Sequence, residues 1–301
     1  MKPITLLSAV LFAVSLACTA PASFARQDDA KDPATAGAQA PAAAAAQVPP
    51  GEQQAKAALE KSPRHGEWVD VAVPGSETPL RTYVVYPERK DNAPVVIVIH
   101  EIFGLTDWIR SVADQLAADG FIAVAPDLLS GRGPGGGGTE AVGSRDEVTK
   151  LVRAIKPEDV VKGLDAVRDY GMKLPAANGK TATIGFCWGG AMSFHYATAQ
   201  PGLNAAVVYY GTSPSDAAAF EKINAPVQGH YGGDDQRVNA TIPTATEQMK
   251  KLNKTYEPHV YEGAGHGFLR AQADRNGANA KAAQQAWPAT VRFIRANAEK
   301  K

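Results

Sequence analysis

The pattern of apolar and polar residues divides the chain beyond residue 63 into alternating strands and helices. Short apolar runs bounded by turn residues are typical of strands that are covered on both faces. Such runs occupy residues 95–99, 121–125, 181–185, 203–210, 226–231 and 259–262. Apolar residues recur at helical spacing between them, in segments 106–120, 156–170, 244–252 and 280–297. Strands that alternate with helices predict an α/β fold with a mostly parallel central sheet and helices on both of its faces.

The segment before the first of these runs has a different pattern. Apolar and polar side chains alternate between residues 67 and 87, and the turn residues Pro74, Gly75 and Ser76 interrupt the alternation. This pattern predicts an N-terminal antiparallel hairpin at the edge of the sheet. Ligands in such folds bind beyond the carboxyl ends of the parallel strands. The residues that follow each predicted strand are therefore the candidates for chemistry.

The first residues are typical of an export signal. Lys2 precedes an apolar stretch over residues 4–17, and Ser23 and Ala25 occupy the −3 and −1 positions of a cleavage site. We therefore expect a signal peptide over residues 1–25 and a periplasmic or secreted protein. The apolar stretch is short for a bilayer, so we expect no membrane span.

A lipoprotein is the alternative destination. Cys18 follows two small or apolar residues, but Ser15 stands where a lipidation site has an apolar residue. Residues 26–63 are rich in Ala, Pro, Gln and Gly, and we interpret them as a disordered linker. Within this linker, residues 53–61 could form a short helix, although nothing there suggests chemistry. The predicted catalytic domain covers residues 64–301.

Composition limits the classes of function. The 301 residues include 31 basic and 31 acidic ones, and this balance does not favour nucleic acid or anionic membranes as partners. The length suits one catalytic domain, which we expect to be a monomer. Loss of Cys18 with the signal would leave Cys187 as the only thiol, which excludes an internal disulfide and dithiol redox chemistry.

The residues Gly185-Phe186-Cys187-Trp188-Gly189 join a predicted strand to a helix-like stretch. Glycines two residues on either side of a central residue allow a sharp, strained turn that lifts its side chain above the sheet. The pattern predicts a nucleophile elbow with Cys187 in place of serine. The alternative is that Cys187 is a small buried apolar residue and that the glycines serve helix packing.

Two later strand ends supply what a cysteine nucleophile needs. Asp234 and Asp235 follow the strand 226–231, and His266 follows the strand 259–262. The order nucleophile, acid, histidine is that of the α/β-hydrolases. A thiol has a pKa of about 8.5, so a positioned histidine raises its reactivity, and a carboxylate orients that histidine. Either aspartate could be this carboxylate, or a capping residue.

The first long strand ends in His100-Glu101-Ile102-Phe103-Gly104. In this architecture the loop at that position lends one backbone N–H to the oxyanion hole, and the residue after the nucleophile lends the other. We therefore expect these donors at Ile102 and Trp188. On general grounds Glu101 would be a capping or solvated carboxylate.

Two further patterns give negative results. The glycine-rich run 131–138 lacks the Gly-Lys-Ser/Thr of a phosphate loop, and we interpret it as a mobile loop near the strand ends. Four of the other histidines invite a metal hypothesis but lack a metal-binding spacing, so we expect no metal site. These histidines are His100, His195, His230 and His259.

Three motifs together resemble the dienelactone hydrolase family: His-Glu-Ile-Phe-Gly at 100–104, Gly-Phe-Cys-x-Gly-Gly at 185–190 and Gly-His-x-Phe at 265–268. The resemblance spans residues 66–297. It implies that Cys187 is the nucleophile, that Asp235 and His266 complete the triad, and that Glu101 takes the proton of a resting thiol when substrate binds. Arg270, four residues after the histidine, would bind a substrate carboxylate, with Arg132 as a second arginine.

These observations predict an exported hydrolase that opens a lactone or carboxylic ester of the dienelactone type through a thioester at Cys187, without a cofactor. Trp188 stands where members of the family carry a smaller aliphatic residue, which leaves the substrate open. One alternative is a broad-specificity carboxylesterase with the same fold. Another is a non-catalytic binding protein or a thiol sensor that uses the same pocket. In each reading the partner is a small molecule.

Overall fold

The structure is a computed structural model, and it describes residues 47–299. The predicted signal peptide, Cys18 and the first part of the predicted linker lie outside the described residues. The strands are β1 Gly66–Val71, β2 Leu80–Val85, β3 Ala93–Ile99, β4 Ile122–Pro126, β5 Ala177–Phe186, β6 Ala205–Tyr209, β7 Val227–Gly232 and β8 Tyr256–Tyr261. The α-helices are α1 Glu52–Lys61, α2 Asp107–Ala118, α3 Arg145–Arg153, α4 Pro157–Met172, α5 Trp188–Ala199, α6 Gln236–Asn239, α7 Ile242–Lys251 and α8 Ala278–Ala298.

The eight strands form one mixed sheet in the order β1-β2-β4-β3-β5-β6-β7-β8. The two pairings of β2, with β1 and with β4, are antiparallel, and all other pairings are parallel. The α/β prediction and the N-terminal hairpin at the sheet edge are therefore confirmed. Each of the six predicted apolar runs overlaps one strand from β3 to β8.

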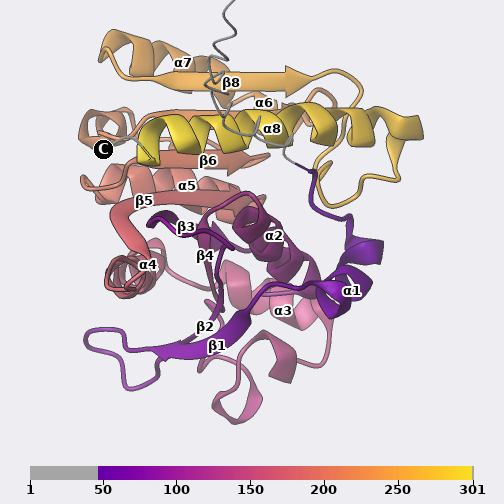
Figure 1. The fold of residues 1–301 in the computed structure, drawn as a ribbon. Helices are drawn as coiled ribbons and strands as arrows, with labels where there is room; N and C mark the ends of the chain where they lie inside the picture. The colour runs from indigo at the N-terminus through magenta and orange to yellow at the C-terminus, as the bar shows by residue number, and fades with distance from the viewer. Residues whose placement is uncertain (1–46, 300–301) are drawn as a thin grey trace, which may run out of the picture. The chain divides into compact units, whose positions relative to one another are not determined.

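Helices cover both faces of the sheet (Figure 1). Side chains of α2 and α8 pack into one apolar cluster, and those of α4, α5 and α7 pack into the other. Strand β3 feeds both clusters, because successive side chains of a strand point to opposite faces. Val96 and Val98 belong to the first cluster, whereas Val95 and Ile97 belong to the second. This arrangement explains why β3 is apolar throughout and completely buried.

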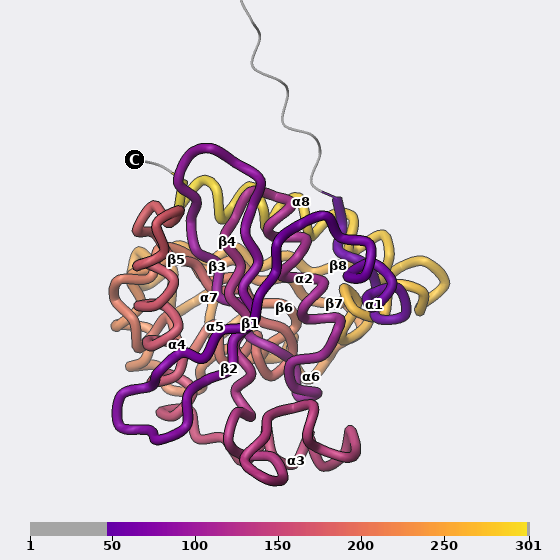
Figure 2. Tube along the Cα trace, turned by 60° about the horizontal axis from the view of Figure 1, so that its bottom comes forward, coloured from indigo at the N-terminus to yellow at the C-terminus, as the bar shows by residue number. Residues whose placement is uncertain are grey.

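The N-terminal boundary of the domain differs from the prediction. Residues 52–61 of the predicted linker form α1, so the disordered linker is wrong for this stretch, and the suggested helix over residues 53–61 is correct. Ala55 is buried in the cluster beside α2, and the Ser62 hydroxyl donates to Asp114 of α2 at 2.5 Å. In Figure 2, α1 also lies beside the yellow C-terminal segment that precedes α8. Burial of even this short helix against the core is enough to order it.

Helix α3, over Arg145–Arg153, was not predicted. Ser144 caps its start, because the Ser144 hydroxyl oxygen accepts from the Glu147 backbone N–H at 3.3 Å. The glycine-rich run before it is held at its far end, because Asp127 accepts hydrogen bonds from the N–H and hydroxyl of Thr139, both at 2.7 Å. The loop between β4 and α3 is thereby fastened to the carboxyl end of β4.

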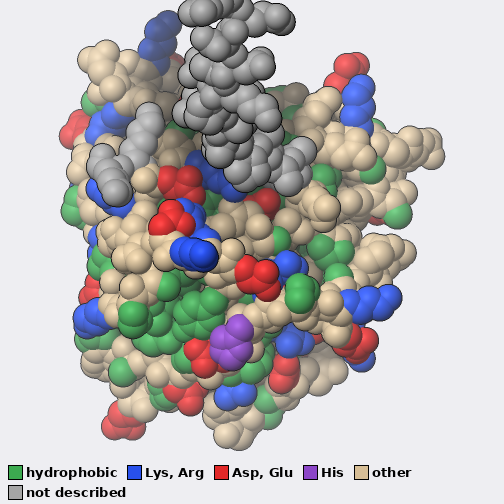
Figure 3. All heavy atoms as spheres, viewed as in Figure 1, with side chains coloured by type: hydrophobic (Ala, Val, Ile, Leu, Met, Phe, Trp, Pro, Cys, Tyr) green, Lys and Arg blue, Asp and Glu red, His purple; other side chains and the backbone are tan. Residues whose placement is uncertain are grey.

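The described part of one face of the molecule agrees with the balanced composition. Acidic and basic side chains are interspersed over the described part of the face in Figure 3, and neither sign dominates it. Among the described residues, no helix combines the length and the apolar character that crossing a bilayer requires.

Candidate active site

Cys187 lies on a strained turn between β5 and α5. Its backbone has a φ of 54° and a ψ of −114°, an unusual combination for a residue with a side chain. The turn is held by the Cys187 N–H, which donates to Tyr209 O at 3.0 Å, and by the Ala191 N–H, which donates to Cys187 O at 3.1 Å. The side chain is half-buried and not sealed in the core.

The flanking glycines are required by close approaches of the backbone. A Cβ at Gly185 would lie 1.9 Å from Gly189 O, and a Cβ at Gly189 would lie 2.3 Å from His100 O. No side chain fits at these distances without movement of the main chain. The glycines thus bring the start of α5 against the end of β3, which places Cys187 beside the segment that carries Glu101.

Asp235 and not Asp234 contacts His266. The Asp235 Oδ2 atom lies 2.5 Å from His266 Nδ1, whereas Asp234 pairs with Arg275 on the surface at 2.8 Å. Asp235 also caps α6 by accepting from the Val238 N–H at 3.5 Å, which fixes the carboxylate. Burial opposes ionisation of Asp235, but the hydrogen bond and charge of His266 lower its pKa below the ordinary value.

The imidazole of His266 lies between Asp235 and Cys187. Burial alone would lower the pKa of His266, but hydrogen bonds and charge interactions with Asp235 and Cys187 raise it to about 9. Because Nδ1 faces Asp235, Nε2 remains available for the thiol. The ring of Tyr210 packs edge-on against this imidazole with 5.2 Å between ring centroids. The structure therefore brings together Cys187, His266 and Asp235 from three separate strand ends.

Glu101 is buried directly after β3 and faces Arg270. The Arg270 Nε atom lies 2.8 Å from Glu101 Oε2, and only 4% of the Glu101 side chain is exposed. Burial is the main cause that raises the pKa of Glu101 to about 7, while the charges of Arg270 and His266 act in the opposite direction. A carboxyl group with this pKa is partly protonated near neutral pH, whereas a solvated carboxylate is almost fully ionised there.

The two backbone N–H groups that we predicted as oxyanion donors belong to Ile102, in the segment after β3, and to Trp188, the residue after Cys187. Trp188 is the first residue of α5, so its N–H has no partner within the helix. Within residues 47–299, the N–H of Ile102 has no protein acceptor either. The indole of Trp188 stacks on the buried ring of His100, with 5.6 Å between their centroids.

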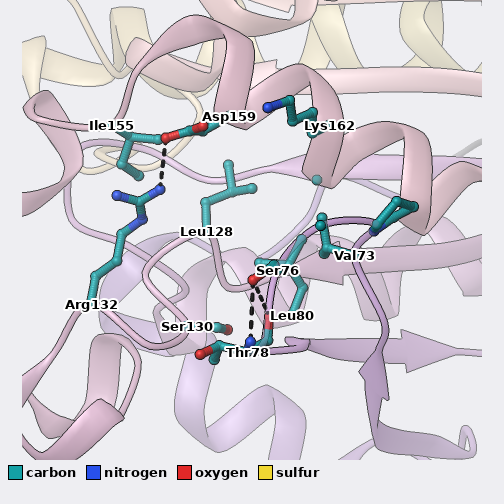
Figure 4. A pocket seen from close by; sticks show the side chains of 13 residues that line it. Val73, Ser76, Thr78, Leu80, Leu128, Ser130, Arg132, Ile155, Asp159 and Lys162 are labelled. Atoms are coloured by element: carbon teal, nitrogen blue, oxygen red, sulfur yellow. Dashed lines mark hydrogen bonds and ion pairs between the residues drawn. The ribbon is translucent and has the colours of Figure 1, made fainter.

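Arg132 lies away from these residues. Its guanidinium pairs with Asp159 of α4 at 3.1 Å and lines a hollow of about 300 Å³, which Leu80 and Leu128 also line (Figure 4). The residues that line this hollow include none of Cys187, His266 and Glu101. The structure therefore does not bring Arg132 together with Arg270.

The family to which this arrangement belongs follows from comparison with known proteins. The model of the dienelactone hydrolase family matches residues 80–298, which is most of the chain. The chain belongs to the dienelactone hydrolase family. The motifs at 100–104, 185–190 and 265–268, on which the sequence resemblance rested, all lie inside the matched range.

Relatives in this family are similar over most of the catalytic domain. The "Putative carboxymethylenebutenolidase" of Yersinia pestis is 31% identical over 230 residues, which cover 72% of this chain and 84% of the relative. The carboxymethylenebutenolidase of Pseudomonas putida is 32% identical over 195 residues, which cover 64% of this chain and 82% of the relative. The chain is therefore a dienelactone hydrolase-like hydrolase.

Solved structures show the same fold. The crystal structure named "Putative Dienelactone Hydrolase" from Klebsiella pneumoniae has a TM-score of 0.64 and 29% identity, and the match covers 75% of this chain and 98% of that one. A dienelactone hydrolase-like promiscuous phosphotriesterase from metagenomic libraries, at 23% identity and a TM-score of 0.66, shares the fold. The predicted α/β-hydrolase architecture is confirmed.

Sequence reasoning missed two residues beside the site of this family member. Arg145, at the start of α3, lies over the ring of Phe103 with 4.1 Å between its guanidinium carbon and the ring centroid, and Arg270 lies over the same ring at 5.3 Å. Glu52 of α1 forms ion pairs with both arginines. A lone glutamate in an Ala-rich and Gln-rich stretch carries no sequence signal for such a contact. Within the described residues, no group of three or more His, Cys, Asp or Glu side chains could hold a metal ion.

The buried carboxyl of Glu101 leads to a prediction about stability. Its pKa is about 7 in the folded protein against an ordinary value of 4.5, so the folded state binds the proton more tightly than the unfolded state. The contribution of protonated Glu101 to the free energy of unfolding is therefore complete below about pH 4.5 and is lost as the pH rises through 7. Glu101→Gln does not ionise and should be more stable than the wild type at pH 8, by on the order of 1 to 3 kcal/mol.

Urea unfolding of the wild type and Glu101→Gln at pH 4.5, 6 and 8 measures this difference. The exposed variant Glu60→Gln is the control, and it should follow the wild type at each pH. A stability difference between Glu101→Gln and the wild type that stays constant from pH 4.5 to 8 would contradict the raised pKa.

Proposed function

We propose that this protein hydrolyses lactones or carboxylic esters through a thioester intermediate at Cys187. The single observation that carries the proposal is the line of contact from Asp235 through His266 to Cys187 above the carboxyl ends of β5 and β7. A strained, half-buried thiol beside an oriented imidazole is an arrangement for nucleophilic attack, and structural cysteines do not need it.

The first half-reaction forms the acyl-enzyme. His266 accepts the thiol proton, directly or through Glu101, and the sulfur attacks the carbonyl carbon. The negative charge on the former carbonyl oxygen would be bound by the N–H groups of Ile102 and Trp188. When the intermediate collapses, the carbon–oxygen bond to the leaving oxygen breaks, and His266 donates the proton to that oxygen. In a lactone the leaving oxygen stays attached to the acyl group.

The second half-reaction releases the acid. His266 removes a proton from water, the hydroxide oxygen attacks the thioester carbon, and the carbon–sulfur bond breaks. The thiolate leaves and is reprotonated by His266. An ester therefore yields a carboxylic acid in this step, after its alcohol has left in the first half-reaction. A lactone yields one product, which is a hydroxy or keto acid. The chemistry is complete with these side chains, so we propose no cofactor.

Glu101 supports a resting state that is protected from side reactions. Its carboxyl faces Arg270, and the resemblance to the family implies that a bound substrate moves it toward the thiol. A thiol that is activated only when substrate binds is less open to oxidation in an exported protein.

We infer export from residues 1–25. Mass analysis of the mature protein tests this inference, because cleavage predicts a chain that begins at Arg26, whereas a lipoprotein would begin at a modified Cys18.

The proposed function is tested with a panel of aryl esters and lactones, in which product release is followed and the intact protein mass is recorded during turnover. We expect multiple turnovers and a transient mass increase equal to the acyl group, located on the peptide that contains Cys187. A broad-specificity carboxylesterase would cleave neutral esters at rates comparable to lactones. One acyl adduct per protein that never turns over would contradict hydrolysis and favour a thiol sensor or a binding protein.

A further inference from the structure

Two arginines beside the site share one carboxylate, which comes from outside the matched family region. Glu52 Oε2 lies 2.5 Å from Arg270 Nη1, and Glu52 Oε1 forms an ion pair with Nη2 of Arg145. Arg270 in turn contacts Glu101 at 2.8 Å. Glu52 lies on α1, upstream of the family match that begins at residue 80. The upstream segment therefore places the Glu52 carboxylate next to Arg270, which itself contacts Glu101 of the candidate site.

The position of Glu52 is fixed by the main chain. Its backbone N–H donates to Arg270 O at 2.9 Å, and the Gln272 side chain donates from Nε2 to Pro49 O at 2.8 Å. Farther along α1, Ala55 is buried against the core beside α2. These contacts hold the first turn of α1 against the loop that follows His266. The backbone that carries Glu52 is therefore fixed to the domain at this edge of the site.

Arg145, Arg270 and Phe103 form a binding site for one anion, which we call the Arg145–Arg270 seat. Both guanidinium groups lie over the Phe103 ring, and Phe103 is the next residue after the predicted oxyanion donor Ile102. Guanidinium groups bind carboxylates through charge-assisted hydrogen bonds. The Arg270 side chain is only 20% exposed, so its pair with Glu52 is screened less than a surface pair. Glu52 therefore fills the seat that the carboxylate of an anionic substrate would need.

We propose that Glu52 is a specificity-determining residue that fills the Arg145–Arg270 seat and thereby makes the site favour neutral esters and lactones over substrates that carry a carboxylate. This inference rests on the proposed function for its link to ester and lactone hydrolysis, and it names the substrate class. A substrate carboxylate would have to displace Glu52 from both arginines or remain beside it as a like charge. A neutral substrate leaves both ion pairs intact.

Alkylation of Cys187 tests the seat without any need for turnover. Iodoacetate and iodoacetamide differ only in a carboxylate and an amide, so the ratio of their alkylation rates reports how well the site accepts an anion. We expect Glu52→Gln to raise the iodoacetate to iodoacetamide ratio about tenfold, the effect of one charge-assisted hydrogen bond. Rates are read from the mass of the peptide that contains Cys187, which separates it from Cys18.

Two further variants make the result specific. Glu60→Gln removes the same charge from an exposed position on the same helix, and it should leave the ratio within about twofold of the wild type. The double variant Glu52→Gln with Arg145→Gln should lose most of this increase in the ratio. The iodoacetate carboxylate would then find only one guanidinium group, that of Arg270. A ratio for Glu52→Gln that stays within about twofold of Glu60→Gln would overturn the inference.

Hydrolysis of a matched ester pair links the seat to substrate choice. Mono-4-nitrophenyl glutarate carries a terminal carboxylate, and 4-nitrophenyl valerate is its neutral counterpart of equal acyl length. In Glu52→Gln we expect kcat/KM to rise about tenfold for the glutarate relative to the valerate, mainly through a lower KM. An unchanged preference, with hydrolysis intact, would overturn this inference and leave the proposed function standing. Absence of hydrolysis in the wild type would overturn the proposed function, and the alkylation ratio would still decide the role of Glu52.

Discussion

Replacing Cys187 with alanine is expected to lower kcat/KM for an activated aryl ester by at least about 10⁴-fold, because in the proposed mechanism the Cys187 thiol forms the acyl-enzyme. Alanine keeps the Cβ atom of cysteine, so the strained backbone at a φ of 54° experiences the same sterics. Hydrolysis is followed by release of 4-nitrophenol, and thermal unfolding of the variant shows whether the fold is retained.

Cys187→Ser serves as the matched control for this experiment. It restores a hydroxyl of similar size at the same turn and should give a longer-lived acyl-enzyme together with reduced but measurable turnover. Activity of Cys187→Ala within about tenfold of the wild type would refute the thioester mechanism.

The second large effect is expected for Asp235→Asn, which should lower kcat by about 10³- to 10⁴-fold. Asparagine keeps the size of aspartate and still caps α6, but its amide cannot stabilise the protonated imidazole or hold the same tautomer. The pKa of His266, which the Asp235 hydrogen bond and charge help to raise to about 9, should fall. Alkylation of Cys187 by iodoacetamide across pH 5 to 10 reports this shift in the variant.

Asp234→Asn is the neighbouring control. Asp234 is exposed, faces Arg275 and does not contact His266, so its replacement should change kcat by no more than about threefold. If the two variants lost activity equally, Asp235 would not be the residue that orients His266.

The fold was predictable because its buried strands appear in the sequence as short apolar runs. The run from Val95 to Ile99 packs on both faces, so the sequence has no polar positions there. In β2 the side chains alternate because one face is less covered than the other. Helix α3 escaped prediction because only Val148 and Val152 are buried in it. The usable signal was the spacing of Ser144 and Glu147, in which Ser144 caps the start of the helix.

The site was predictable only as far as backbone geometry demands particular residue types. The glycines around Cys187 follow from such demands. The order of Cys187, Asp235 and His266 along the chain was recognised because it is that of the α/β-hydrolases. The choice of Asp235 over Asp234 as the partner of His266 came from the family resemblance, and the structure shows this contact directly. The pairing of Glu52 with Arg270 spans 218 positions and depends on how α1 packs, which no local pattern encodes.

The docking of α1 also bears on how recombinant versions of the protein should be trimmed. A version cut at residue 64, where the composition changes, or at residue 80, where family similarity begins, would lack Pro49, Glu52 and Ala55. Such a shortened enzyme would leave Arg270 without its upstream carboxylate and uncover part of α2. Its substrate profile would describe the truncation and not the natural protein, so expression should start upstream of residue 47.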